Sequence, residues 1–388
     1  MNTITTEETP PAAPTTSFPG AARAAHYVEQ ATDPEPVAPA TVTEASATVA
    51  APSVPVATLT AEPQPDIETG RDAGADDTDV DLGALSVATA PRVAQSGLRG
   101  LLGKMGVKLA PGSAETAAID IADKLRRNEE IVRQATWTRA VSVLVANPKG
   151  GVGKTPTSLM LGGTLAAIRG GSVCIIEVSD DPGALTFRSE GAHNRGLGEL
   201  VADADGIRSA GQLAGYTAPQ SSFAAVIGSV GWRPRLDGSD VTTITRVVDD
   251  YFAIRVMDSG NQPSSSAFQA AVATADVLVI PIFDAGDAAL EAANLLDGLR
   301  AAGGHAASLA EHAIVLRLHD GRPENPQVVA RVDRILTSHR ITHQHTIPFD
   351  SHIAERGQLT LAKLTATTRH AVTGAAADVV RTLQNIVR

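Results

Sequence analysis

The sequence has few of the residues that cross-link or anchor small cores. It contains one cysteine, Cys174, among 388 residues, which excludes an intrachain disulfide and fits a reducing, cytoplasmic compartment. Two tryptophans, three tyrosines and seven phenylalanines account for 3% of the chain. Because hydrophobic residues still make up 43%, we expect a sizeable core built from Ala, Val, Leu and Ile.

Long hydrophobic runs are also absent. No stretch of about 18 apolar residues occurs, so the sequence predicts no membrane-spanning helix. The first residues show no basic start followed by an apolar core, so we expect no secretory signal peptide. The histidines at 339, 343, 345 and 352 have no regular ligand spacing and no paired cysteines, which argues against a metal site there.

The negative charge is concentrated in one part of the chain. The net charge is −11, yet residues 1–90 alone hold 14 acidic residues and two arginines, so the remainder is nearly neutral. Residues 1–90 are rich in Ala, Pro and Thr and lack helical periodicity, so we expect a disordered acidic arm. Two interpretations of this arm remain open: a partner-binding or spacing segment, and a solvated tail.

A basic linker and a helix are predicted over residues 91–136. Within it, residues 92–110 interleave Lys and Arg with Leu, Met and Val, and contain no acid. Four glycines weaken any helix in that stretch. It is interpreted as a linker that docks on the following domain, with contact to an anionic membrane or nucleic acid as the alternative.

From residue 137 to residue 388 the pattern predicts one α/β domain. Strands and helices alternate there, as in a doubly wound, mostly parallel sheet of about seven strands. The predicted strands are 140–146, 172–178, 223–229, 252–258, 276–282, 312–318 and 344–348. The predicted helices are 114–135, 155–168, 195–202, 206–214, 240–250, 264–274, 285–301, 326–338 and 366–387. Ligands of such sheets bind at the carboxyl ends of the strands.

The most informative stretch is residues 146–155, Ala-Asn-Pro-Lys-Gly-Gly-Val-Gly-Lys-Thr, between a predicted strand and a predicted helix. Its glycines allow backbone N–H groups to converge on phosphate oxygens at a helix N-terminus. Lys154 can then reach the β- and γ-phosphates, and the Thr155 hydroxyl can ligate Mg²⁺. A glycine-rich turn that binds nothing is the alternative. The predicted nucleotide-binding residues of this loop are Gly150, Gly151, Val152, Gly153, Lys154, Thr155 and Pro156.

The loop departs from the strict phosphate-loop pattern in an informative way. Pro148 stands where that pattern has glycine, and a second lysine, Lys149, lies at the loop entrance. The run Lys-Gly-Gly-Val-Gly-Lys-Thr resembles the deviant Walker A loop of the ParA/MinD family of partition and positioning ATPases. The resemblance covers residues 139–388 and implies ATP and Mg²⁺ as ligands. It also implies an ATP-dependent homodimer in which Lys149 reaches the partner's nucleotide.

Residues 177–182, at the end of the second predicted strand, resemble switch I of that family. Glu177 matches its first carboxylate, whereas Ser179 replaces the second. A serine is no comparable base, so the resemblance implies slow hydrolysis, with Asp181 or Asp180 holding the attacking water. The alternative for these two aspartates is a turn or a helix cap.

Two further segments complete the predicted site. Residues 252–258 form an apolar strand that ends in Asp258, as in a Walker B segment, so Asp258 is predicted to hold Mg²⁺ together with Thr155. The following residues 259–263 resemble switch II. Pro348, Phe349 and Asp350 resemble the family's Pro-x-Asp segment beside the adenine, although residues 314–319 lack the asparagine that relatives often carry for that base.

The catalytic set implied by the resemblance is Lys149, Lys154, Glu177, Asp181 and Asp258. It describes a cytoplasmic Mg²⁺-dependent ATPase, most similar to partition-type ATPases of high-GC bacteria, which occur on mobile elements and beside type VII secretion systems. The expected role is plasmid or chromosome partitioning, with non-specific DNA and a hydrolysis-stimulating protein as partners. The alternatives are a positioning ATPase of a secretion, conjugation or membrane-associated machine, with membrane contact less favoured, and a weakly hydrolysing scaffold.

Overall fold

The computed structural model describes residues 112–387. The predictions for the arm, residues 1–90, and for the basic stretch, residues 92–110, lie outside the described residues. Within the described part, no helix is long and apolar enough to cross a membrane.

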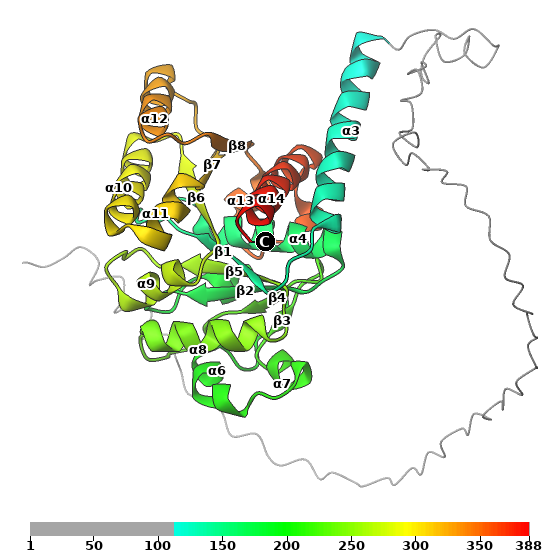
Figure 1. The fold of residues 1–388 in the computed structure, drawn as a ribbon. Helices are drawn as coiled ribbons and strands as arrows, with labels where there is room; N and C mark the ends of the chain where they lie inside the picture. The colour runs from blue at the N-terminus through cyan, green and yellow to red at the C-terminus, as the bar shows by residue number, and fades with distance from the viewer. Residues whose placement is uncertain (1–111, 388) are drawn as a thin grey trace, which may run out of the picture. The chain divides into compact units, whose positions relative to one another are not determined.

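An eight-stranded sheet forms the centre of the fold, in the order β3-β4-β2-β5-β1-β6-β7-β8 (Figure 1). All neighbouring strands are parallel except β3, which runs antiparallel to β4. The doubly wound α/β prediction is therefore confirmed, with one strand more than the seven predicted. The strands are β1 Val141–Val145, β2 Val173–Val178, β3 Ala218–Pro219, β4 Ala225–Ile227, β5 Ile254–Ser259, β6 Val277–Phe283, β7 Ile314–Leu318 and β8 His343–Ile347.

Helices cover both faces of the sheet, which explains why central strands such as β1 are buried along their whole length. Helices α3, α4 and α14 contribute to the core on one face, and α6 and α8–α12 to the core on the other. The helices are α3 Ser113–Gln134, α4 Lys154–Arg169, α5 Leu185–Arg188, α6 Leu197–Asp203, α7 Ala210–Ala214, α8 Gly238–Asp249, α9 Ser266–Ala273, α10 Gly286–Ala302, α11 Gly304–Glu311, α12 Pro326–Ser338, α13 Ser351–Ala354 and α14 Ala366–Ile386.

Helix α3 is fastened to the sheet domain at its C-terminal end. Val132 and Ala135 are buried in the same core as α4 and α14. The guanidinium of Arg169 donates to the carbonyl of Val132 at 2.7 Å and to that of Ala135 at 2.9 Å, and it lies over the ring of Trp137. The last turns of α3 are thus part of the folded domain.

Helices α5, α11 and α13 were not predicted from the sequence. Helices α5 and α13 have four residues each, too short to show a hydrophobic period. Helix α11 is separated from α10 by Gly303 and Gly304, which both have positive φ angles of 72° and 53°. L-residues with side chains rarely adopt such angles, so this glycine pair ends one helix and allows the next to begin.

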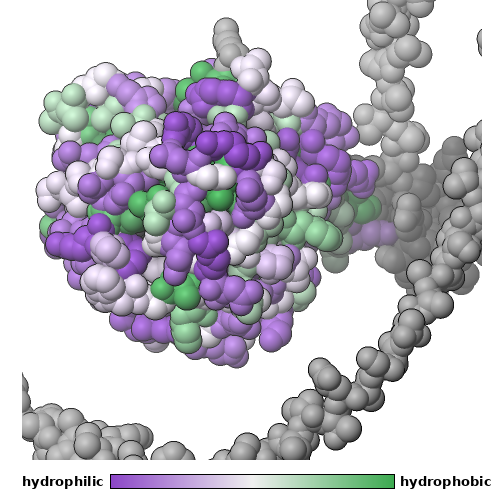
Figure 2. All heavy atoms as spheres, turned by 90° about the horizontal axis from the view of Figure 1, so that it is seen from below, coloured by the Kyte–Doolittle hydropathy of each residue, from purple (hydrophilic) through white to green (hydrophobic). Residues whose placement is uncertain are grey.

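The face seen from below carries α6, α7 and α8 (Figure 1). Its surface is mostly polar, with apolar residues in small separate groups (Figure 2).

The carboxyl ends of the central strands bring polar residues together. There β5 pairs with β1 and with β2, and Asp258 lies in register with both Val145 and Glu177. The loops that follow these three strands therefore meet at one edge of the sheet.

Candidate nucleotide-binding site

The glycine-rich loop connects β1 to α4, as predicted. Gly151 and Gly153 have φ angles of 78° and 92°, in the region that favours glycine. A Cβ atom at Gly153 would also lie 2.9 Å from the Leu318 side chain. Gly153 is therefore required both by the backbone and by the close approach of β7, and it starts α4 so that the helix N-terminus faces the loop.

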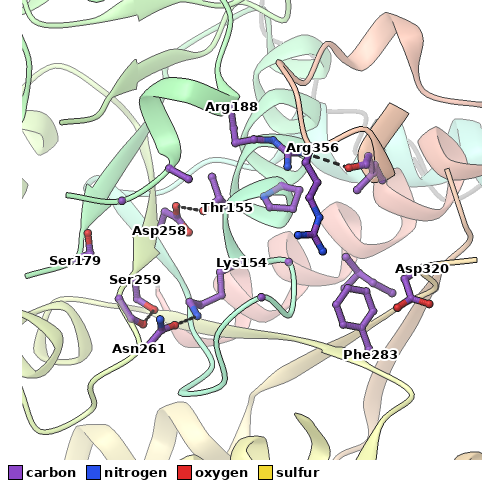
Figure 3. Close-up of a pocket in the computed structure, with 18 of the residues that line it drawn as sticks. Lys154, Thr155, Ser179, Arg188, Asp258, Ser259, Asn261, Phe283, Asp320 and Arg356 are labelled. Atoms are coloured by element: carbon purple, nitrogen blue, oxygen red, sulfur yellow. Dashed lines mark hydrogen bonds between the residues drawn. The ribbon is translucent and has the colours of Figure 1, made fainter. Parts of the chain in front are cut away.

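The side chain of Lys154 runs back along this loop (Figure 3). Its ammonium donates to the carbonyl of Asn147 at 2.9 Å and to that of Lys149 at 3.2 Å, and it contacts the side-chain oxygen of Asn261. Burial lowers the pKa of Lys154 to about 8. The loop thus keeps one buried cation at its centre, directly linked to residues 259–263 that resemble switch II.

Asp258 meets the start of α4 from the end of β5. Its carboxylate accepts from the Thr155 hydroxyl at 2.7 Å and from the Ser158 hydroxyl at 3.2 Å. Burial raises the pKa of Asp258 to about 7, against the effect of the Thr155 hydrogen bond, which lowers it. Adjacent hydroxyl and carboxylate oxygens are the ligands that Mg²⁺ prefers, so Thr155 and Asp258 fit the predicted ion.

Glu177 is buried beneath the surface of the site and does not line the cavity into which the glycine loop opens. It is 1% exposed and is engaged by the guanidinium of Arg233 at 3.0 Å and by the hydroxyl of Ser229. The structure therefore makes the first carboxylate of the switch I segment, residues 177–182, one member of a buried ion pair.

Arg233 is a residue that sequence reasoning missed. All its side-chain N–H groups are used: it donates to Ser229, to Glu177, and to the carbonyls of Ser179, Asp180 and Pro234, at 2.7 to 3.0 Å. Its own exposure is 4%. Since two of these carbonyls belong to switch I, Arg233 holds the backbone of that segment in place. Nothing in the run Gly-Trp-Arg-Pro-Arg around it signals this role.

The two aspartates of switch I have a common partner. Arg235 pairs with Asp180 and with Asp181, both at 3.0 Å. Asp180 is largely buried, whereas the Asp181 side chain is 65% exposed. The Ser179 hydroxyl donates to the carbonyl of Asp181 at 2.6 Å, so Ser179 shapes a turn.

A cavity of about 910 Å³ joins these segments. It is lined by the glycine loop, by switch I and switch II, and by the ends of β7 and β8. Its apolar part, with Phe283, Leu318 and Ile353, was not anticipated, because these residues come from three separate segments. Its lining includes Gly151, Gly153, Lys154, Thr155, Pro156, Asp181, Asp258, Asn261, Gln262, Phe283, Leu318, His319, Pro348, Asp350 and Ile353.

The Pro348–Asp350 segment is only partly directed at this cavity. Pro348 lines it, whereas Phe349 is 47% exposed and its ring packs against Gly321 outside it. Asp350 accepts from the backbone N–H groups of His352 at 3.1 Å and Thr365 at 2.8 Å, and these bonds lower its pKa despite burial. Asp350 is therefore the N-cap of α13.

Lys149 lies at the loop entrance with its side chain on the surface. Its ammonium pairs with the carboxylate of Asp287, in the first turn of α10, at 2.8 Å. Both side chains are well exposed, and exposed pairs contribute little to stability.

A family model for the CobQ/CobB/MinD/ParA nucleotide-binding domain matches residues 143–361, more than half of the chain. The chain belongs to this family. The match starts in β1 and ends in the segment that follows α13, so it encloses the glycine loop, both switch segments and the cavity wall of this CobQ/CobB/MinD/ParA domain.

Several solved structures are similar to this chain. A ParA family ATPase from Chlorobium tepidum has a TM-score of 0.52 and 14% identity, over 61% of this chain and 98% of that one, and it shares the fold. The cell division ATPase MinD of Pyrococcus furiosus has a TM-score of 0.47 and 16% identity, over 62% and 99% of the two chains. The septum site-determining protein MinD of Pyrococcus horikoshii has a TM-score of 0.46 and 15% identity, over 64% and 99%. No curated protein matches the chain.

Proposed function

We propose that this protein is a Mg²⁺-dependent ATPase switch that dimerises on ATP and separates after hydrolysis. The observation that carries the proposal is the meeting of Lys154, Thr155 and Asp258 at a glycine loop that opens into a 910 Å³ cavity. A nucleotide-binding family and the apolar residues that line the same cavity support the same assignment.

In this proposal each side chain has a separate task. Bound Mg²⁺ neutralises charge on the phosphate oxygens, and Thr155 with Asp258 would hold it. The ammonium of Lys154 stays with the transferred phosphoryl group. Asn261, which contacts that ammonium, changes position when the phosphoryl group is present. Asp181 or Asp180 positions water once Arg235 releases them, and Glu177 acts through Arg233 rather than on the nucleotide.

The proposed cargo is DNA, bound without sequence preference. Arg331 and Arg334 are exposed on α12, Arg340 is exposed just after it, and none of the three lines the cavity. Arginines on one surface bind phosphates electrostatically, with an affinity that falls as salt rises. Lys363 and Arg369 are further exposed cations near the start of α14, and we assign them a weaker contribution.

Retention of the protein on non-specific duplex DNA tests this proposal. We expect retention with Mg²⁺ and ATP at low salt, and loss with ADP or at high salt. The triple variant Arg331→Ala, Arg334→Ala, Arg340→Ala should lose retention and keep its ATP turnover. As a matched control, Arg126→Ala, Arg127→Ala, Arg133→Ala on α3 removes the same charge. Absence of retention in every nucleotide state, even at low salt, would favour the positioning or scaffold alternatives.

Dimerisation is expected to need Lys149 and ATP together. Lys149→Gln should weaken the ATP-dependent dimer by about 30-fold or more, because truncating one member of a buried interface charge pair costs about 2 kcal/mol or more. Asp287→Asn frees Lys149 from its present partner and should leave the dimer intact or tighter. Light scattering with ATP and Mg²⁺ measures both. A Lys149→Gln dimer as strong as the wild type would remove the intermolecular role.

Asp258→Asn should separate metal binding from stability. Because the pKa of Asp258 is raised to about 7 in the folded state, the folded protein binds the proton of this carboxyl group more tightly than the unfolded chain does. The contribution of Asp258 to the stability of the nucleotide-free protein therefore falls as pH rises from about 4 to about 7. The variant should unfold at a higher temperature than the wild type, with an advantage that grows as the pH rises to about 7 and then levels.

The same variant should bind Mg²⁺-ATP at least about tenfold more weakly, since it lacks the carboxylate. Calorimetric melting at acidic and at slightly alkaline pH, and titration with Mg²⁺-ATP, give the two results. A variant that is less stable than the wild type at alkaline pH would contradict the buried-charge argument.

A further inference from the structure

Two arginines, Arg188 and Arg356, line the nucleotide cavity (Figure 3). Arg188 is the last residue of α5, and Arg356 follows α13. They approach each other closely enough for the charge of Arg356 to act on Arg188. Neither belongs to a motif of the sequence, and the function proposed above assigns them no role.

No carboxylate pairs with either arginine within residues 112–387. Arg188 is 8% exposed, and the one hydrogen bond of its guanidinium in that range runs to the carbonyl of Ile353 at 3.4 Å. Its Nε group is buried and has no partner among the described residues. The nearest carboxylate in sequence to Arg356, that of Glu355, is engaged by His352 at 3.3 Å.

Two neighbouring arginines without a carboxylate partner among the described residues cost free energy when no anion is bound. Burial lowers the pKa of Arg188, and the charge of Arg356 lowers it further. Burying a guanidinium that has an unused donor and a second cation beside it costs free energy. Binding of an anion compensates that cost. By contrast Arg322, which also lines the cavity, pairs with Asp320.

The sequence at the start of α4 leaves a bound phosphate with one hydrogen-bond donor fewer. Helix α4 starts with Lys154 and Thr155, and the third position is Pro156, which also lines the cavity. Free N–H groups of a first helical turn bind phosphate, but proline has none, and it has no hydroxyl either. A phosphate beside this turn therefore lacks one donor on the loop side.

We propose that Arg188 and Arg356 form a second phosphate subsite of the nucleotide cavity, which holds a phosphate that is not transferred. Arginine suits this task, because its planar donors bind phosphate oxygens in pairs. The phosphate is either the α-phosphate of the nucleotide or a phosphate on its ribose. This subsite rests on the nucleotide-binding function proposed above.

Binding of four ligands tests the subsite: ADP, AMP, adenosine 3′,5′-bisphosphate and adenosine, each measured by calorimetric or competition titration. Arg188→Gln and Arg356→Gln should each bind the phosphate-bearing ligand of the subsite about 10- to 100-fold more weakly, the range expected for a lost charge-assisted hydrogen bond. Adenosine binding should not change. Arg322→Gln is the matched control, since it also lines the cavity but is already paired.

The ligands distinguish the two sources of phosphate. Equal losses for AMP and ADP identify the α-phosphate, whereas losses confined to adenosine 3′,5′-bisphosphate identify a ribose phosphate. Arg356 is exposed, so its variant should fold even if the buried Arg188→Gln variant does not. Unchanged affinities in Arg356→Gln and in a folded Arg188→Gln would overturn the subsite. A wild type that binds no ATP at all would instead overturn the function on which the subsite rests.

Discussion

Lys154→Ala is expected to reduce ATP turnover by about 10²–10³-fold, the effect of removing one preorganised charge that stabilises a transition state. The ammonium of Lys154 is held inside the glycine loop by two backbone carbonyls, at 2.9 and 3.2 Å, and by contact with Asn261. It is thus placed before any nucleotide arrives, and within residues 112–387 no other lysine lines the cavity. ATP affinity should fall as well, because the ground-state phosphates lose the same charge.

The measurement is steady-state phosphate release together with ATP titration. Lys154→Met keeps much of the side-chain volume and separates the loss of charge from the loss of packing. Lys363→Ala, an exposed lysine outside the cavity lining, serves as the control. Turnover and affinity that remain at wild-type values in both Lys154 variants would remove the phosphate-loop assignment.

Arg233→Met is expected to destabilise the fold by about 3–5 kcal/mol, the usual cost of leaving one member of a buried ion pair without its partner. Glu177 is 1% exposed, and the variant would leave its charge with only the Ser229 hydroxyl. The carbonyl of Ser179 would also lose its Arg233 donor, and that of Asp180 would keep only the backbone N–H of Leu236, at 3.0 Å. We therefore expect switch I to become mobile even in molecules that remain folded.

A double variant separates charge from geometry. Arg233→Met with Glu177→Gln removes both charges, so it should recover part of the lost stability, while the carbonyls of Ser179 and Asp180 still lack the Arg233 donors. Arg235→Met is the matched control: it removes an arginine that is 62% exposed and pairs with Asp180 and Asp181, and it should cost about 1 kcal/mol, less than Arg233→Met. Urea unfolding of all three variants gives these values. If Arg233→Met and Arg235→Met lose equal stability, the buried pair does not anchor this segment.

The Arg233 pair also bears on hydrolysis. Because Arg233 fixes the backbone that carries Asp180 and Asp181, a loose switch I would misplace both carboxylates relative to bound nucleotide. A modest misplacement of a catalytic group is enough to lower turnover strongly. Arg233 is thus a positioning residue in the proposed mechanism.

The sequence by itself determined the architecture and the phosphate loop. The strands are buried on both faces, so they appear as continuous apolar runs such as residues 141–145, and most of the intervening helices are long enough to show their period. The loop is a contiguous motif whose glycines, Lys154 and Thr155 act within one turn of chain, so its chemistry is local. Asp258 could be predicted for a similar reason, since it lies at the end of an apolar strand and parallel strands end at the same edge.

Only the tertiary structure decided which charges are paired and which remain available. Glu177 and Arg233 are 56 residues apart, Arg188 and Ile353 are 165 apart, and Asp180 meets Arg235 across a loop whose sequence carries no motif. Likewise Phe349 and Pro348 are neighbours in sequence, yet only Pro348 lines the cavity.

The physical reason is that an ion pair depends on burial and on the approach of distant segments, and neither is encoded in the spacing of residues along the chain. For that reason the sequence could predict the glycine loop and the position of Asp258 at the end of β5. The fold was needed to show that Arg233 holds the switch I backbone and that Arg188 and Arg356 lie in the cavity wall without a carboxylate partner among the described residues.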